Sequence, residues 1–241
     1  MIKAGIDVGA KTIKVVLMED GKIRGKGKVL SGFDQEESAK EALEQALMEA
    51  QLSREAIGII VTTGNGRKAI SYATDDVTEA RAAALGAVFL YPSARTVIDV
   101  GAEEARAIKC DSSGKVLDFA VNEKCAAGSG AFTEAMARAL EVPLEELGPL
   151  SLRSTQTIPM NAQCTVFAES EVVSLIHSKT QKADIAVRRV GLEPELVLIG
   201  GVAHNPGFVE SFKRTAELDN VRTAEDPEFV GAIGAALAAG E

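Results

Sequence analysis

The sequence contains no tryptophan, and aromatic residues make up only 4% of its 241 residues. Proteins that bind single-stranded nucleic acid stack the bases on aromatic rings, so this composition argues against such a role. Basic residues are also in the minority, with 26 Lys and Arg against 35 Asp and Glu and a net charge of −9. A chain of this charge lacks the clustered cations that neutralise a phosphate backbone, and we expect no nucleic-acid partner.

Long apolar runs and paired cysteines are missing as well. No stretch reaches the roughly 18 apolar residues that a membrane span requires. The N-terminal segment carries an early Asp7 and alternates in polarity, which is typical of a strand and not of a signal peptide. We therefore expect a cytoplasmic protein without a membrane segment. Its three cysteines are an odd number and do not make a disulfide framework.

What the sequence does contain is an internal repeat. Residues 6–10 and residues 98–102 both read Ile-Asp-Val-Gly-Ala. Each copy is followed by a second apolar stretch, a turn rich in Asp and Gly, and a third stretch, a pattern that predicts three strands joined by tight turns. Helical periodicity comes next, at 36–50 after the first copy and at 129–140 after the second. The repeat predicts a duplicated α/β fold.

The two copies of the repeat also suggest the limits of the domains. Short apolar segments at 57–62 and 195–199 are the expected fourth strands of the two halves. We expect a first domain over 1–93 and a second over 94–226. A C-terminal helix at about 227–241 is expected to pack back on the first domain.

Both copies of the repeat carry an Asp-x-Gly turn, formed by Asp7 and Gly9 and by Asp99 and Gly101. The glycines let the backbone approach a phosphate, and the carboxylates can hold Mg²⁺ through water. Such a turn is also common with no ligand, but two copies in register favour a nucleotide cleft between the domains. No helix opens with a Walker A or dinucleotide glycine motif, so the expected site is not a P-loop.

Two further glycines, Gly200 and Gly201, follow the segment at 195–199. In a cleft between two domains they would let a nucleoside lie directly on the backbone, because a Cβ would block its approach. Glycines after strands are common turn residues, and that alternative stays open.

Cys125 and Cys164 each lie where a predicted helix begins. The positive end of a helix dipole favours thiolate, the form that binds iron. Plain burial of the two thiols is an equally good interpretation of these cysteines. A [4Fe–4S] cluster takes four thiolates, which two chains with two cysteines each can supply. Cys110 alternates within a predicted strand and is interpreted as a core residue.

Five segments of the chain resemble the ATPases that activate 2-hydroxyacyl-CoA dehydratases and the ATP-hydrolysing subunits of benzoyl-CoA reductases. They read GIDVG at 5–9, TGNGR at 63–67, NEKCAAGSG at 122–130, QCTVFAESEVVS at 163–174 and GGVA at 200–203. The resemblance implies duplicated ribonuclease-H-like domains of the actin and sugar-kinase type, with ATP and Mg²⁺ in the cleft. It also implies a homodimer, or a heterodimer with a related subunit, bridged by one [4Fe–4S] cluster.

Residue roles follow from the resemblance by motif. Cys125 and Cys164 would bind the cluster, and Asp7, Asp99 and Glu103 would be catalytic. The residues expected around the nucleotide are Gly9, Lys11, Thr12, Gly101, Gly128, Gly130, Gly200 and Gly201. Glu103 stands where the family's second phosphate loop often has a neutral Gln, and the segment near 184–187 is about one helix shorter than is usual there.

The function implied is ATP hydrolysis coupled to delivery of a low-potential electron. A ferredoxin or flavodoxin would be the donor, and a dehydratase or reductase component the acceptor. The residues leave two alternatives open: a phosphotransferase of the sugar or acetate kinase type without a cluster, and a regulator that binds ATP without hydrolysing it.

Overall fold

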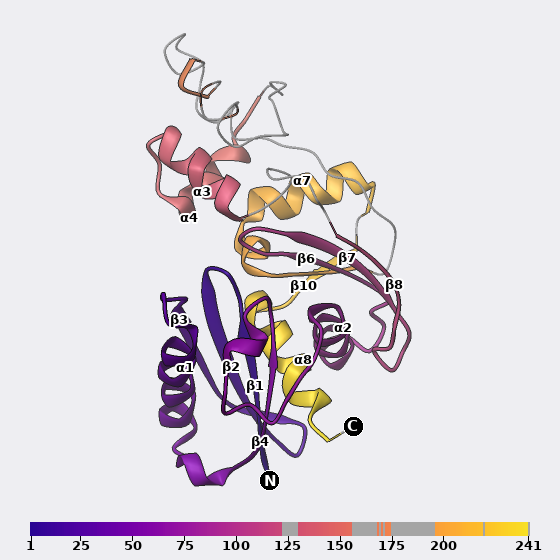
Figure 1. Cartoon of the computed structure of the whole chain (residues 1–241). Helices are drawn as coiled ribbons and strands as arrows, with labels where there is room; N and C mark the ends of the chain where they lie inside the picture. Colours follow the sequence, from indigo (N-terminus) through magenta and orange to yellow (C-terminus); the bar gives the residue numbers. More distant parts are fainter. Residues whose placement is uncertain are drawn as a thin grey trace. The chain divides into compact units, whose positions relative to one another are not determined.

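The computed structural model describes residues 1–121, 130–155, 168, 170, 172–174, 196–218 and 220–240. The chain forms two compact units (Figure 1). The first contains Met1–Val97, Ile108–Phe119 and Ala224–Glu241, and the second contains Ile98–Ala107 and Ala120–Thr223. In the part of the chain just delimited, every helix is too short or too polar to cross a membrane.

The first sheet has the strand order β3-β2-β1-β4-β5. Its strands are β1 (Ile2–Val8), β2 (Thr12–Glu19), β3 (Lys22–Leu30), β4 (Ile57–Thr63) and β5 (Asp75–Asp76). The central strand β1 pairs with β2 in antiparallel fashion and with β4 in parallel fashion. The carboxyl ends of β1 and β4 therefore lie side by side, at the edge where ligands bind in open α/β sheets.

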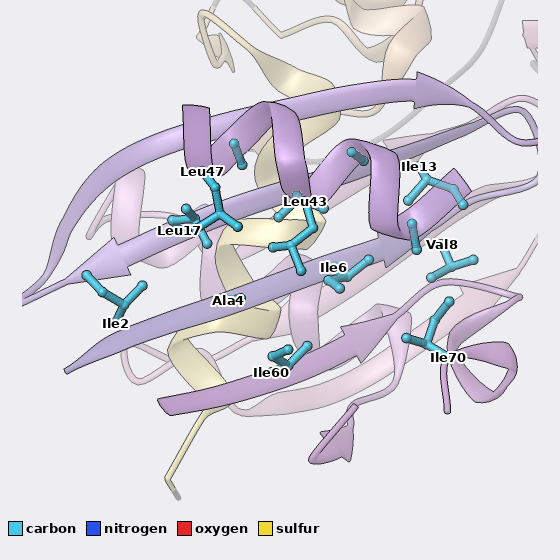
Figure 2. Packing of buried hydrophobic residues seen from close by; sticks show 14 residues of the cluster. Ile2, Ala4, Ile6, Val8, Ile13, Leu17, Leu43, Leu47, Ile60 and Ile70 are labelled. Atoms are coloured by element: carbon cyan, nitrogen blue, oxygen red, sulfur yellow. The ribbon is translucent and has the colours of Figure 1, made fainter. Parts of the chain in front are cut away.

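Helix α1 (Gln35–Ala50) covers one face of this sheet. Its N-cap is Asp34, whose side chain accepts a hydrogen bond from the amide of Glu37. Leu43 and Leu47 of α1 pack on Ile6 and Leu17 of the sheet in the core shown in Figure 2. The burial of these side chains supplies the main driving force for this layer of the fold.

The opposite face is covered by α8 (Val230–Ala238), which comes from the C-terminal end of the chain. Ile233 and Ala236 of α8 pack on Val16 and Met18 of β2. Helix α2 (Glu79–Leu90) lies along α8 (Figure 1). The first unit is thus a three-layer sandwich of helix, sheet and helices.

The second sheet has the strand order β10-β9-β6-β7-β8. Its strands are β6 (Thr96–Val100), β7 (Ala105–Cys110), β8 (Val116–Val121), β9 (Leu196–Ile199) and β10 (Val221–Thr223). Read from the other edge, this is the order of the first sheet with each strand number raised by five. The predicted duplication of an α/β fold is therefore confirmed.

Helix α7 (Pro206–Ala216) packs Phe212 against Ile98 and Leu198 of the second sheet. Two more helices, α3 (Gly130–Ala139) and α4 (Leu144–Ser151), share a separate core with Leu140. Single turns of 3₁₀ helix stand at Arg54–Ala56, Arg67–Ala69, Gly201–His204 and Pro227–Phe229.

The helices and strands predicted from the sequence agree with this arrangement where the structure describes them. The helix expected at 36–50 is α1, and the fourth strands expected at 57–62 and 195–199 are β4 and β9. The helix expected at 129–140 is α3, which begins at Gly130. The shortened segment near 184–187 lies outside the described residues.

Helix packing in the first unit depends on backbone contacts at glycines. A Cβ added to Gly234 of α8 would stand 1.7 Å from the carbonyl oxygen of Ala82 in α2. We expect Gly234→Ala to lower the free energy of unfolding by about 1–3 kcal/mol through overpacking, which exceeds the roughly 1 kcal/mol that alanine gains over glycine in a helix. Urea denaturation followed by circular dichroism measures the change.

Gly231→Ala is the matched control in the same helix. The nearest atom to its added Cβ is Asp7 Oδ2, at 3.5 Å, which is ordinary contact. We expect this variant to be as stable as the wild type or slightly more so. Equal destabilisation of the two variants would contradict the packing argument.

Candidate functional site

Asp7 forms an ion pair at the carboxyl end of β1. It lies opposite Lys14 of β2 in the strand register, and Lys14 Nζ donates to Asp7 Oδ2 at 3.0 Å. The two side chains are only 18% and 12% exposed, so solvent screens the pair less than it screens a surface salt bridge. Lys14 also donates to the carbonyl of Thr12 at 3.2 Å, which fixes the cation beside the turn.

The turn after Asp7 requires glycine. A Cβ on Gly9 would stand 2.9 Å from the carbonyl oxygen of Thr12 and 3.1 Å from Lys14 Nζ. Ser31, which follows β3, braces the turn: its hydroxyl donates to the carbonyl of Gly9 at 2.6 Å and its amide donates to that of Lys11 at 2.9 Å. Hydrogen bonds from Lys14 and from Ser31 therefore hold the turn in shape.

The second copy of the turn has the same charged elements. Arg106 Nη1 lies 3.7 Å from Asp99 Oδ2, and Arg106 Nη2 donates to Glu104 Oε2 at 2.6 Å. Arg106 follows Asp99 by seven residues, as Lys14 follows Asp7. Each half of the chain therefore places a cation from its second strand against the aspartate of its first.

Helix α3 begins directly at the second turn. The amides of Gly130 and Ala131 donate to the carbonyls of Gly101 and Ala102, at 2.7 and 2.8 Å. Glu103, at the tip of this turn, is exposed. The structure thus brings Asp99, Gly101, Glu103 and Gly130 together in one loop region.

Each aspartate also lies against a glycine at the end of the neighbouring strand. Gly64 follows β4 with φ +90°, and Gly200 follows β9 with φ +87°. A Cβ on Gly64 would stand 2.4 Å from the carbonyl oxygen of Val8 and 2.7 Å from Asp7 Oδ1. In the same way, a Cβ on Gly200 would stand 2.4 Å from the carbonyl oxygen of Val100 and 2.6 Å from Asp99 Oδ1. Gly64 is thus the counterpart of Gly200 in the first half. Gly201, the residue after Gly200, has open space around its Cβ position.

The first turn can hold a divalent cation through water. Mg²⁺ at a nucleotide takes one or two carboxylates and fills its shell with water and phosphate oxygens, and Asp7 can be such a carboxylate. Within the described ranges, no group of three or more His, Cys, Asp and Glu residues forms a ready-made metal cage. The donor set fits hydrated Mg²⁺ bound with a nucleotide, not an ion enclosed by protein.

The cysteines divide into two groups. Cys110 is buried, burial raises the pKa of its thiol, and its Sγ lies 3.9 Å from the carbonyl oxygen of Ala94, which confirms the interpretation of a core residue. Cys125, Cys164 and Gly128 lie outside the described residues, so their predicted roles stay predictions.

Sequence reasoning missed Lys14, Arg106 and Gly64. The common seven-residue spacing from each aspartate to a cation could have revealed the first two, because it repeats in both copies. Gly64 has a different distance along the chain from its aspartate than Gly200 has, and only the pairing of strands shows their equivalence.

Two copies of one α/β sheet, each with an Asp-Gly turn after its first strand, define the class of duplicated α/β proteins that the sequence predicts. The model of the BadF/BadG/BcrA/BcrD ATPase family matches residues 4–239, nearly the whole chain. The chain belongs to this family.

Three relatives agree with that assignment. The activator of lactoyl-CoA dehydratase from Anaerotignum propionicum is 38% identical over 255 aligned positions, which cover 100% of this chain and 98% of the relative. The crystal structure of component A of (R)-2-hydroxyglutaryl-CoA dehydratase from Acidaminococcus fermentans is similar with a TM-score of 0.91 and 32% identity, covering 98% of this chain and 96% of that one. The activator of 2-hydroxyisocaproyl-CoA dehydratase from Clostridium difficile, solved with bound ADPNP, is similar with a TM-score of 0.90 and 34% identity. The match covers 98% of this chain and 93% of that one.

The glycine beside Asp7 makes a direct test of the site geometry. We expect Gly64→Ala to lower the free energy of unfolding by about 2–4 kcal/mol, because it combines a left-handed backbone with a clash at the carbonyl of Val8. Gly21 has φ +73° but open space around it, so Gly21→Ala carries only the backbone cost of about 1–2 kcal/mol. Denaturation of both variants separates the two contributions, and equal losses would show that the contact at Val8 has no effect.

Proposed function

We propose that this protein is an ATP-dependent electron-transfer activator, which hydrolyses ATP to deliver a low-potential electron to an acyl-CoA dehydratase or a benzoyl-CoA-type reductase. The observation that carries the proposal is the full-length similarity to the activator of lactoyl-CoA dehydratase. The two Asp-Gly turns support it, because backbone amides in such glycine turns can donate to phosphate oxygens.

In this proposal both turns contact the nucleotide phosphates. Backbone amides of the turns at Gly9 and Gly101 would donate to phosphate oxygens, and Gly200 and Gly201 would leave room for the adenosine. Lys14 and Arg106 would add positive charge as the phosphates bind. Asp7 would hold Mg²⁺ through water, and bound Mg²⁺ neutralises charge that develops on the phosphates during hydrolysis. Glu103, exposed at the tip of the second turn, would orient the attacking water.

The electron carrier would be a [4Fe–4S] cluster held by Cys125 and Cys164 from each of two protomers. Such a cluster, when bound, stores one electron that a ferredoxin or flavodoxin supplies. Coupling to ATP requires that the nucleotide bind two conformations of the dimer with different affinity. The protein would therefore pass electrons to the enzyme that acts on the acyl-CoA and would not act on it itself.

Iron content tests the ligand assignment. Protein purified without oxygen should be brown and contain about four iron atoms per two chains. We expect Cys125→Ala and Cys164→Ala each to lose the colour and most of the iron. Cys110→Ala is the matched control and should retain both, because Cys110 is buried in the core of the described structure.

The same preparation separates the proposal from its rivals. A colourless wild-type protein that releases ADP only when a sugar or acetate is added would contradict the activator and support a phosphotransferase. A protein that binds ATP but does not hydrolyse it, with or without a reductant, would support a regulator.

A further inference from the structure

Within the described ranges, a buried hydroxyl next to Asp7 has no hydrogen-bond partner. Thr63 is the last residue of β4, the residue is 1% exposed, and its Oγ1 makes no hydrogen bond to any residue that the structure describes. A buried polar group left unpaired costs about 1–3 kcal/mol. Such a group is rare in native structures and calls for an explanation, for example an ion or water that binds there.

Thr63 and Asp7 are neighbours on the same face of the sheet. The two residues are partners in the parallel register of β4 and β1, and strands so paired lie about 4.8 Å apart. Val61, two residues before Thr63, packs against Ala235 of α8, so this face is the one that α8 covers. Asp7 lies on that face too, because its Oδ2 is 3.5 Å from the Cβ position of Gly231 in the first turn of α8.

The second half of the chain shows what the fold itself needs at this position. There the residue before the strand-end glycine is Ile199, which is equally buried at 1% exposure. Ile199 directly precedes Gly200, which lies against Asp99. Thr63 likewise directly precedes Gly64, which lies against Asp7. Since an apolar side chain fills the equivalent place, the hydroxyl of Thr63 is not required for folding.

We propose that the hydroxyl of Thr63 binds a water of the Mg²⁺ shell that Asp7 holds, and that the first turn, not the second, is the cation side of the site. A water on Mg²⁺ donates its hydrogens, and the carboxylate of Asp7 and Oγ1 of Thr63 are two acceptors in adjacent strands. Thr63 is then a positioning residue that orients the hydrated cation. The second turn, with Ile199 in place of Thr63, offers only one of these acceptors. This inference rests on the proposed binding of ATP with Mg²⁺.

The test uses the full-length protein, the analogue ADPNP, and Mn²⁺ as a spectroscopic substitute for Mg²⁺. Electron paramagnetic resonance measures the affinity for Mn²⁺ in the presence of ADPNP, and thermal unfolding without nucleotide measures stability. For Thr63→Val we expect about tenfold weaker Mn²⁺ binding, as for the loss of one hydrogen bond, with an unchanged or higher melting temperature. Thr63→Ser should keep the wild-type affinity for Mn²⁺.

Thr62→Val is the matched control. Thr62 is also buried in β4, but its hydroxyl donates to the carbonyl of Arg67 at 2.9 Å. This variant should lose several degrees in melting temperature, because it breaks a hydrogen bond that the fold uses.

The outcomes separate the inference from the proposed function. Wild-type affinity for Mn²⁺ in Thr63→Val, or a loss of stability in that variant as large as in Thr62→Val, overturns the role of Thr63 alone. A wild-type protein that binds neither ADPNP nor Mn²⁺ overturns the proposed function itself.

Discussion

The contact between β1 and α8 at Gly5 determines both the core and the site of the first unit. A Cβ on Gly5 would stand 2.0 Å from the carbonyl oxygen of Ala232 and 2.4 Å from the amide nitrogen of Ala236. Because glycine has no side chain, the helix lies directly on the central strand and the two alanines are fully buried. This placement also carries the first turn of α8, at Gly231, to Asp7. The positive end of the helix then lies beside a carboxylate, which it stabilises.

Because the sheet is duplicated, each residue of one half can be compared with its equivalent in the other half. Features that occur in both, such as the cation seven residues after the aspartate and the glycine with positive φ, belong to the common design of the turn. Features that differ point to separate roles. One difference is that Thr63, whose hydroxyl has no partner in the described part of the chain, stands where the second half has the apolar Ile199. Another is that Ser31 braces the first turn, whereas the second turn is bonded to the start of α3.

Much of this arrangement could be predicted because it is local in the sequence. The Asp-x-Gly turns, the hairpins after them and helix α1 depend on periodicity and turn chemistry within about 20 residues. Helices α2, α4 and α7 escaped prediction. Helix α2 is rich in alanine and has no polar face with helical spacing, because it packs among the helices of the first unit. The ion pair of Lys14 was missed for a different reason: a lysine that alternates in a strand is usually solvated, and only the strand register turns it toward Asp7.

The sequence by itself determined the duplication, the α/β class, the position of both turns and the core role of Cys110, because each follows from residue patterns between near neighbours. Tertiary structure alone decided which residues surround each aspartate. Lys14 from β2, Thr63 and Gly64 from the end of β4, and Gly231 from α8 reach Asp7 from three different segments. For Thr63, Gly64 and Gly231, the distance along the chain carries no signal of that meeting. The physical reason is that pairing between strands and packing between layers join residues that are remote in the chain, and these long-range contacts are chosen by burial of the whole core rather than by any local motif.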